Sequence, residues 1–185
     1  MEASQDLSVL LERLSRVLQN EGHAEGLKPT QWEALRYLGR ANRFSRTPSG
    51  LTAYLGVTKG TVSQTLNALE RKGLLAKRSE PADRRQLRLD LTAKGLRLLE
   101  RDPVDAILRL SGRLPKQARR ELARSLETLL VATLAERDGR PFGLCRSCRH
   151  FLANDPEGAP HRCALLEVAL SAADSEQICV EQEPA

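Results

Sequence analysis

The stretch that decides the fold is LGVTKGTVSQTLNALERKGLL, residues 55–75. A turn at Gly56 precedes Thr58, a favourable N-cap, and Gly73 is typical of a helix end. The apolar side chains between them recur at helical spacing and predict one buried side. They are Val62, Leu66 and Leu69. We therefore expect a helix, a tight glycine turn and a second helix.

The outward face of this second helix carries hydrogen-bonding side chains and no carboxylate among those we assign to it. They are Lys59, Thr61, Ser63, Gln64, Asn67 and Arg71. The phosphate-lined groove of DNA repels carboxylates, whereas Gln64 and Asn67 suit bidentate contacts to adenine. Lys59, near the helix start, suits a phosphate or a guanine. This pattern predicts a helix that enters the major groove.

A small hairpin follows the second helix. Leu74–Arg78 and Gln86–Leu91 alternate as two short strands, and the tip between them, residues 79–85, contains a proline and the adjacent Arg84 and Arg85. A polar tip of this kind protrudes into solvent with a positive end. The helix pair and the hairpin together predict a winged helix-turn-helix that binds double-stranded DNA.

The remaining pattern before residue 138 is helical. We expect helices over residues 7–18, from a Thr30 cap to Gly39, and from a Ser49 cap over residues 51–55. A helix from Thr92 must break at residues 102–103 and stop before Pro115, and a last one carries the leucines of residues 122–134. The fold class is therefore mainly α with a small β-hairpin wing. The leucine stripes of residues 7–18 and 122–134 exceed what a small helical core needs to bury, so they need an apolar partner.

These residues resemble the MarR family of dimeric winged helix-turn-helix regulators. The resemblance covers roughly residues 5–138, and its most specific part is DRRQLRLDLTAKG, residues 83–95. It implies that Asp83 braces the wing and that Arg84 or Arg85 enters the minor groove. It also implies a homodimer joined by the first and last helices, on a pseudo-palindromic operator with half-sites about one turn, roughly 10 bp, apart or a small multiple of that.

Charge and cysteine content divide the chain at the same place. The chain has 29 basic and 24 acidic residues, a net charge of +5. Residues 139–185 hold four arginines against seven acidic residues, so this segment carries −3 and residues 1–138 carry +8. All four cysteines lie in the acidic segment. We predict two units, a winged-helix and dimerisation domain over residues 1–138 and a loop-rich metal-binding extension over residues 139–185.

The cysteines follow a C-x2-C pair and then two single positions. They are Cys145, Cys148, Cys163 and Cys179. In a reducing compartment such a cluster favours metal binding over disulfides. Structural zinc sites usually use two close pairs, whereas an iron–sulfur cluster tolerates separated loops. Resemblance to high-potential iron–sulfur proteins, carried by this spacing and Phe151, points to a [4Fe–4S] cluster; zinc is the alternative. His150 and His161 flank the cysteines and are expected to be surface residues.

Several function classes are excluded by pattern. No apolar run reaches the roughly 20 residues of a membrane span, and the acidic start does not resemble a secretion signal, so we expect a cytoplasmic protein without a membrane partner. There is no phosphate-loop motif, no haem-attachment motif and no recognisable nucleophile arrangement, so we expect no enzyme.

The leading hypothesis is a homodimeric regulator whose operator affinity responds to a cluster held by the cysteines, with the change passing through the dimerisation helix to which the extension is joined. One alternative is a repressor with a structural zinc site and a small-molecule effector. Another is an electron-transfer or docking module in which the helical domain serves only dimerisation.

Overall fold

The computed structural model describes residues 2–21, 23–79, 87–137, 139–140, 142–155 and 158–185. The predicted wing residues Asp83, Arg84 and Arg85 lie outside these described residues. The main helices are α1 (Glu2–Glu21), α2 (Pro29–Arg40), α3 (Pro48–Leu55), α4 (Lys59–Arg71), α5 (Ala93–Leu99), α6 (Pro103–Ser111) and α7 (Lys116–Ala135). Short turns are η1 (Ala24–Gly26), η2 (Cys145–Ser147) and α8 (Ala172–Ser175).

The strands form three small antiparallel sheets. The wing pairs β1 (Leu75–Ser79) with β2 (Leu87–Leu91), with Leu75 opposite Leu91. The C-terminal extension contains a pair, β3 (Gly143–Leu144) with β7 (Ile178–Cys179), and a three-stranded sheet. That sheet orders β4 (Phe151–Ala153), β5 (His161–Cys163) and β6 (Val168–Leu170). The prediction of a mainly helical winged-helix fold is confirmed.

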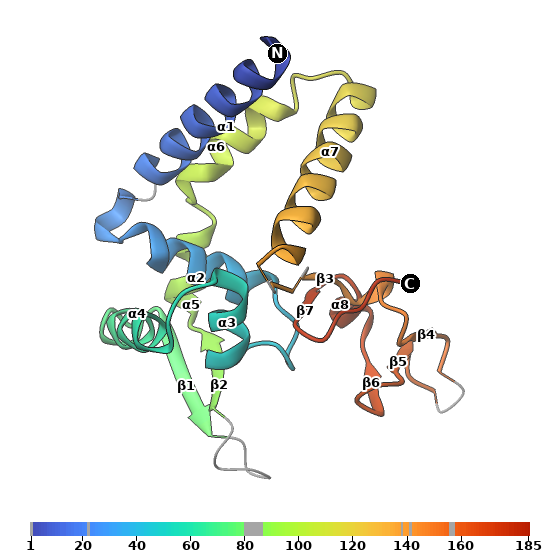
Figure 1. Cartoon of the computed structure of the whole chain (residues 1–185). Helices are drawn as coiled ribbons and strands as arrows, with labels where there is room; N and C mark the ends of the chain where they lie inside the picture. Colours follow the sequence, from blue (N-terminus) through green and yellow to red (C-terminus); the bar gives the residue numbers. More distant parts are fainter. Residues whose placement is uncertain (1, 22, 80–86, 138, 141, 156–157) are drawn as a thin grey trace.

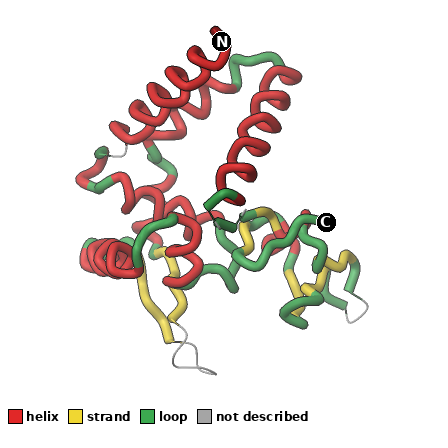
Figure 2. Tube along the Cα trace, viewed as in Figure 1, coloured by secondary structure: helices red, strands yellow, loops and turns green. Residues whose placement is uncertain are grey.

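Helices α2 to α5 and the wing enclose the main core, which we call the winged-helix lobe (Figure 2). Trp32 and Tyr37 of α2 are completely buried, and Val62, Leu66 and Leu69 of α4 are buried as predicted. The apolar side chains of each helix recur every three or four residues, which places them on one face of the helix against this core.

Two glycines are required by the backbone of the lobe. Gly56 ends α3 in the left-handed conformation, with φ of 63°, which glycine adopts without steric cost. A β-carbon on Gly95, the last residue of the LTAKG motif, would collide with the carbonyl oxygen of Leu74. This contact lets the start of α5 pack directly against the chain that enters the wing.

Two helix starts differ from the prediction. Helix α2 begins at Pro29 after Lys28, rather than with Thr30 as its cap. Helix α3 begins at Pro48, and its N-cap is Thr47 rather than Ser49, because the Thr47 hydroxyl accepts the backbone N–H of Gly50 at 3.0 Å. In both cases proline occupies the first helical turn, where its missing N–H costs nothing. Strand β1 starts at Leu75, one residue later than predicted, while Gln86, predicted to begin the second strand, lies outside the described residues.

Helices α1, α6 and α7 extend away from the lobe (Figure 1). Helix α1 contacts α2 and α6, whereas α7 stands apart from this pair in the view of Figure 1. None of the described residues of α6 or α7 is buried. Leu10 of α1 is 64% exposed and Leu130 of α7 is 57% exposed. None of the helices in the described part of the chain combines the length and apolar character that a membrane crossing requires.

A buried ion pair fixes the start of α6 to the lobe. Asp102 accepts two hydrogen bonds from the Arg36 guanidinium, at 2.6 and 2.8 Å, and caps α6 by accepting the Val104 N–H at 2.9 Å. Its side chain is only 5% exposed. Burial by itself raises the pKa of Asp102, but the hydrogen bonds from Arg36 and Val104 outweigh it, so the pKa is lowered.

We expect Asp102→Asn to lower the free energy of unfolding by about 2–4 kcal/mol at pH 7, because the partly buried guanidinium of Arg36 would lose its counter-charge. Since the folded-state pKa is depressed, the stabilisation is present above the unfolded-state value of about 3.9 and is lost as the pH falls through the folded-state value. Urea unfolding of both proteins between pH 7 and pH 3 should therefore show the difference shrinking in acid. Asp105→Asn, on the same helix, should cost less than about 1 kcal/mol. A constant difference at all pH values would contradict the ion-pair account.

Candidate nucleic-acid interface and cysteine pocket

Helix α4 presents the predicted polar face to solvent. All six predicted residues are exposed: Lys59, Thr61, Ser63, Gln64, Asn67 and Arg71. Thr58 caps the helix by accepting the Thr61 N–H at 3.1 Å, and its hydroxyl also lies 3.0 Å from the Thr61 hydroxyl. The buried side chains on the opposite face of α4 hold the helix in place. Its polar face is therefore exposed to a partner with a groove wide enough to admit a helix.

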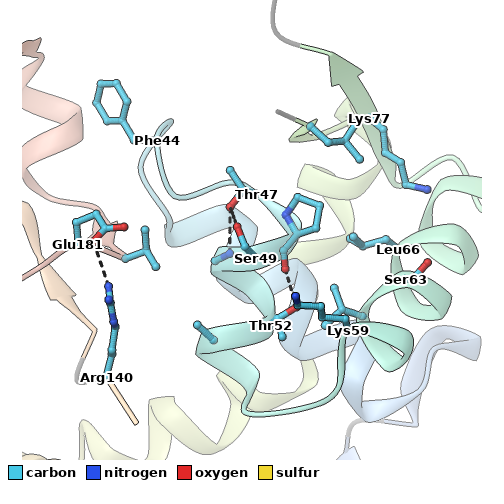
Figure 3. A pocket seen from close by; sticks show the side chains of 16 residues that line it. Phe44, Thr47, Ser49, Thr52, Lys59, Ser63, Leu66, Lys77, Arg140 and Glu181 are labelled. Carbon is cyan, nitrogen blue, oxygen red and sulfur yellow. Dashed lines mark hydrogen bonds and ion pairs between the residues drawn. The ribbon is translucent and has the colours of Figure 1, made fainter. Parts of the chain in front are cut away.

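Two hollows flank this face. One, of about 480 Å³, lies between α4 and the start of α2 and is lined by Gln64, Asn67, Arg71 and Lys28. The other, of about 780 Å³, lies between α3, α4, the wing and the extension (Figure 3). Lys59, Ser63 and Lys77 line it from the lobe, while Arg140 and Glu181 line it from the extension and form an ion pair at 3.1 Å.

Sequence reasoning missed the role of Lys77. Its ammonium group donates to the Asn67 side-chain oxygen at 2.5 Å and to Glu70 at 2.8 Å. Asn67 can therefore offer both ends of its amide to a base only if Lys77 moves. Glu70 is also exposed on α4, so the outer surface of the helix does contain a carboxylate, neutralised by this lysine.

The four cysteines come together in one small pocket, hereafter the cysteine pocket. Cys145, Cys148, Cys163 and Cys179 line a common cavity of about 10 Å³. They arrive from η2, the residue after it, β5 and β7. All four are free thiols, and all but Cys148 are buried. Apolar side chains close the cavity: Phe151, Leu165 and Leu170. Residues more than 30 positions apart are thus brought to a single sulfur-lined site.

Hydrogen bonds polarise the thiols. Cys145 donates to Cys179, which lowers the pKa of Cys179 and raises that of Cys145. The side chain of Asn42 donates to the Cys145 sulfur at 3.4 Å, and the Glu183 N–H donates to the Cys148 sulfur at 3.5 Å. Donors aimed at sulfur stabilise thiolate and are typical of metal–sulfur sites. His150 also lines the pocket, with its Nε2 atom 3.4 Å from Glu183.

The arrangement of the four thiols can be compared with what a single metal ion and what an iron–sulfur cluster require. Within the described residues, no three histidine, cysteine or acidic side chains are arranged to hold one metal ion. A tetrahedral zinc ion holds its sulfurs about 3.8 Å apart, as Zn–S bonds of about 2.3 Å require. A cuboidal cluster spreads its ligands over four irons and needs wider spacing. The all-sulfur donor set and apolar walls fit such a cluster in chemical type.

The extension docks on the winged-helix lobe, which the sequence did not predict. The contact is made by residues 41–47, the loop between α2 and α3, which we call the junction loop. Arg43 donates to the Ala169 carbonyl at 2.6 Å and lies 3.8 Å from the Asp174 carboxylate. Phe44 packs against the cysteine cluster. Outside this loop, Tyr54 of α3 is 38% exposed and contacts Phe142 of the extension edge to face at 5.1 Å.

The sequence and fold match known regulators. Residues 25–86 match the MarR family model. The chain is 34% identical over 88 residues to the transcriptional repressor MprA of Escherichia coli (strain K12). The aligned segment is 48% of this chain and 48% of that protein. Residues 25–86 therefore resemble the winged helix of the MarR family.

The similarity to solved structures covers more of this chain than the match to the family model does. A MarR transcriptional regulator from Methanosarcina mazei Go1 is 25% identical, with a TM-score of 0.56, over 73% of this chain and 99% of that one. Sco3205, a MarR family regulator from Streptomyces coelicolor solved in complex with DNA, has the same fold, with 19% identity and a TM-score of 0.58, over 70% and 87%. The chain spans about half the length of the curated relatives it matches.

Proposed function

We propose that the chain is a homodimeric transcriptional regulator that binds a pseudo-palindromic DNA operator and whose affinity is modulated by a [4Fe–4S] cluster on the four cysteines. The observation that carries the DNA-binding part is the exposed polar face of α4 on a MarR-family winged helix. MarR-family regulators are DNA-binding proteins without enzymatic activity, in agreement with the expectation that this chain is not an enzyme.

In this proposal α4 lies in the major groove, with Gln64 and Asn67 reading base edges and Lys59 on phosphate. Binding a base with both ends of the Asn67 amide requires Lys77 to release its oxygen, and a nearby phosphate is a natural new partner for that ammonium group. Arg84 and Arg85 of the wing, with Asp83 as their brace, would contact the backbone or the minor groove.

The dimer is supported by the apolar surface of the extending helices. Large side chains on α1, α6 and α7 are between about two-fifths and two-thirds exposed: Leu7, Val9, Leu10, Leu14, Val17, Leu108, Leu110, Leu122, Leu126, Leu129, Leu130 and Val131. Contiguous apolar faces of this extent are covered in stable proteins. A second copy offers the same faces around a two-fold axis, which also spaces two α4 helices for two half-sites.

The cluster is supported by the convergence of four free thiols under apolar side chains. When bound, such a cluster supplies a redox-active centre that oxygen or loss of iron can alter. Phe151, Leu165 and Leu170 would shield it from water, and the donors on Asn42 and Glu183 would hold the Cys145 and Cys148 sulfurs in place.

Arg84→Ala should weaken binding to an operator selected from random duplexes and should reduce the slope of log affinity against log salt by about 0.9, the loss of one phosphate neutralised. Gln64→Ala should instead cost about 1–3 kcal/mol at the base it reads and leave the salt slope nearly unchanged. Arg101→Ala, an exposed arginine near the start of α6, is the matched control. Fluorescence anisotropy across a salt series gives both the operator affinity and its salt slope. An Arg84 variant with the salt slope of the parent protein would contradict the proposed wing contact.

Leu130→Glu should convert a dimer to monomers, because it places a charge in the middle of the apolar face of α7. Sedimentation equilibrium measures the mass directly. Arg119→Glu, on the same helix but outside the apolar positions, should leave the mass of the complex unchanged. A monomeric parent protein would contradict the proposed assembly.

Anaerobically purified protein should be brown and contain about four iron and four sulfide per chain, and Cys163→Ser should lose most of both. Iron, sulfide and zinc analysis of the same sample decides the cofactor. A colourless protein with one zinc per chain would reject the cluster and support a structural metal site with another effector. Cluster-loaded and cluster-free protein should differ in operator affinity by roughly 5- to 150-fold.

A further inference from the structure

The junction loop meets the extension through buried backbone and side-chain contacts. Ala41 and Ile178 form a parallel bridge, and the Asn42 N–H donates to the Ile178 carbonyl at 2.9 Å. The hydroxyl of Ser45 accepts the Val180 N–H at 2.9 Å. Asn42 and Ser45 are both completely buried. These contacts surround Cys179, so the segment that carries one pocket thiol is held directly by the loop that precedes α3.

Asn42 connects a pocket sulfur to the turn of this loop. Its Nδ2 atom donates to the Cys145 sulfur at 3.4 Å, while its Oδ1 atom accepts the N–H groups of Ser45 at 2.9 Å and Phe44 at 3.2 Å. An amide is planar and rigid, so a displacement of the sulfur at one end moves the acceptor at the other. The Ser45 side chain of the same loop also reaches the pocket, through a hydrogen bond to Cys179.

The far end of the junction loop is built into the DNA-binding elements. The Arg46 carbonyl accepts the Leu89 N–H of wing strand β2 at 2.8 Å, and Thr47 caps α3. Tyr37 donates to the Ser45 carbonyl at 2.6 Å, and burial, with Cys179 nearby, raises the pKa of Tyr37 and keeps this donor protonated. A β-carbon on Gly50 of α3 would lie 2.6 Å from the Ser45 oxygen. The loop therefore has no free space in which to absorb a shift.

We propose that the junction loop transmits the state of the cysteine pocket to the helix-turn-helix and wing of the same protomer, with Asn42 as the positioning residue. This route replaces the expected one through the dimerisation helix, because α7 has no buried residue among those described and ends seven residues before β3. The consequence for operator affinity rests on the proposed function, but the link between pocket and loop does not.

Hydrogen–deuterium exchange of the full chain tests the route without DNA. Protein reconstituted anaerobically with iron and sulfide is compared with the same protein treated with chelator. Amides of residues 41–55 and of β2 should exchange at least about fivefold more slowly in the reconstituted form, the factor that one hydrogen bond of ordinary strength contributes. Amides of α7 should change less than those of residues 41–55.

Two variants isolate the link. Asn42→Asp keeps the oxygen that accepts from Phe44 and Ser45 but removes the donor to Cys145, so it should retain iron and sulfide yet lose most of the protection difference. Because Asn42→Asp buries a charge, Ser45→Ala is a second variant, which removes the hydroxyl that accepts from Val180 and hydrogen-bonds Cys179. Asn154→Asp is the matched control, since Asn154 is exposed in the extension and its backbone N–H bonds Pro160. It should behave as the parent.

A protection change confined to α7, or an Asn42→Asp protein with the full parent response, would overturn the inference. If the parent takes up no iron and sulfide, the proposed cofactor fails, and the route is tested by comparing Cys145→Ser with the parent. Altered exchange in residues 41–55 would then support it, and unaltered exchange there would reject it.

Discussion

The rest of the structure depends on how Asn42 and Ser45 are satisfied inside the protein. Both side chains are fully buried, and a buried polar group without partners costs more than a hydrogen bond contributes. Their partners Cys145 and Val180 follow them by 103 and 135 residues. The extension is therefore not an independent tail. It supplies part of the polar interior of the winged-helix lobe, and the junction loop contacts the cysteines of the pocket through Asn42 and Phe44.

Three parts of the chain have different physical tasks. The lobe has a dense apolar core and a polar outer helix, which suits a rigid platform that meets a charged partner. Helices α1, α6 and α7 leave apolar faces uncovered, and in the proposed homodimer a second copy would bury them. The Arg36–Asp102 pair joins these two parts at the start of α6, so the angle of the extending helices is set by a buried electrostatic contact.

Features determined by neighbouring residues were predictable. The exposed and buried faces of α4 follow from side-chain spacing, and the break between α5 and α6 follows from Asp102 and Pro103. The true caps of α2 and α3 lie two residues earlier than predicted, because proline occupies the first helical turn and displaces the cap toward the N-terminus. The ties from Lys77 to Asn67 and Glu70 depend on how β1 lies beside α4, which spacing within one helix does not show.

The sequence by itself determined the winged helix, the composition of its outer face, the uncovered leucine stripes and the presence of four thiols in a separate acidic segment. Each of these is a property of residues close together in the chain, where periodicity and capping act. Only the tertiary structure decided that the four thiols share one pocket and that this pocket is joined to the loop before α3. The contacts between the loop and the extension link residues more than 100 positions apart, and their pairing is set by which buried donors and acceptors meet when the chain is packed.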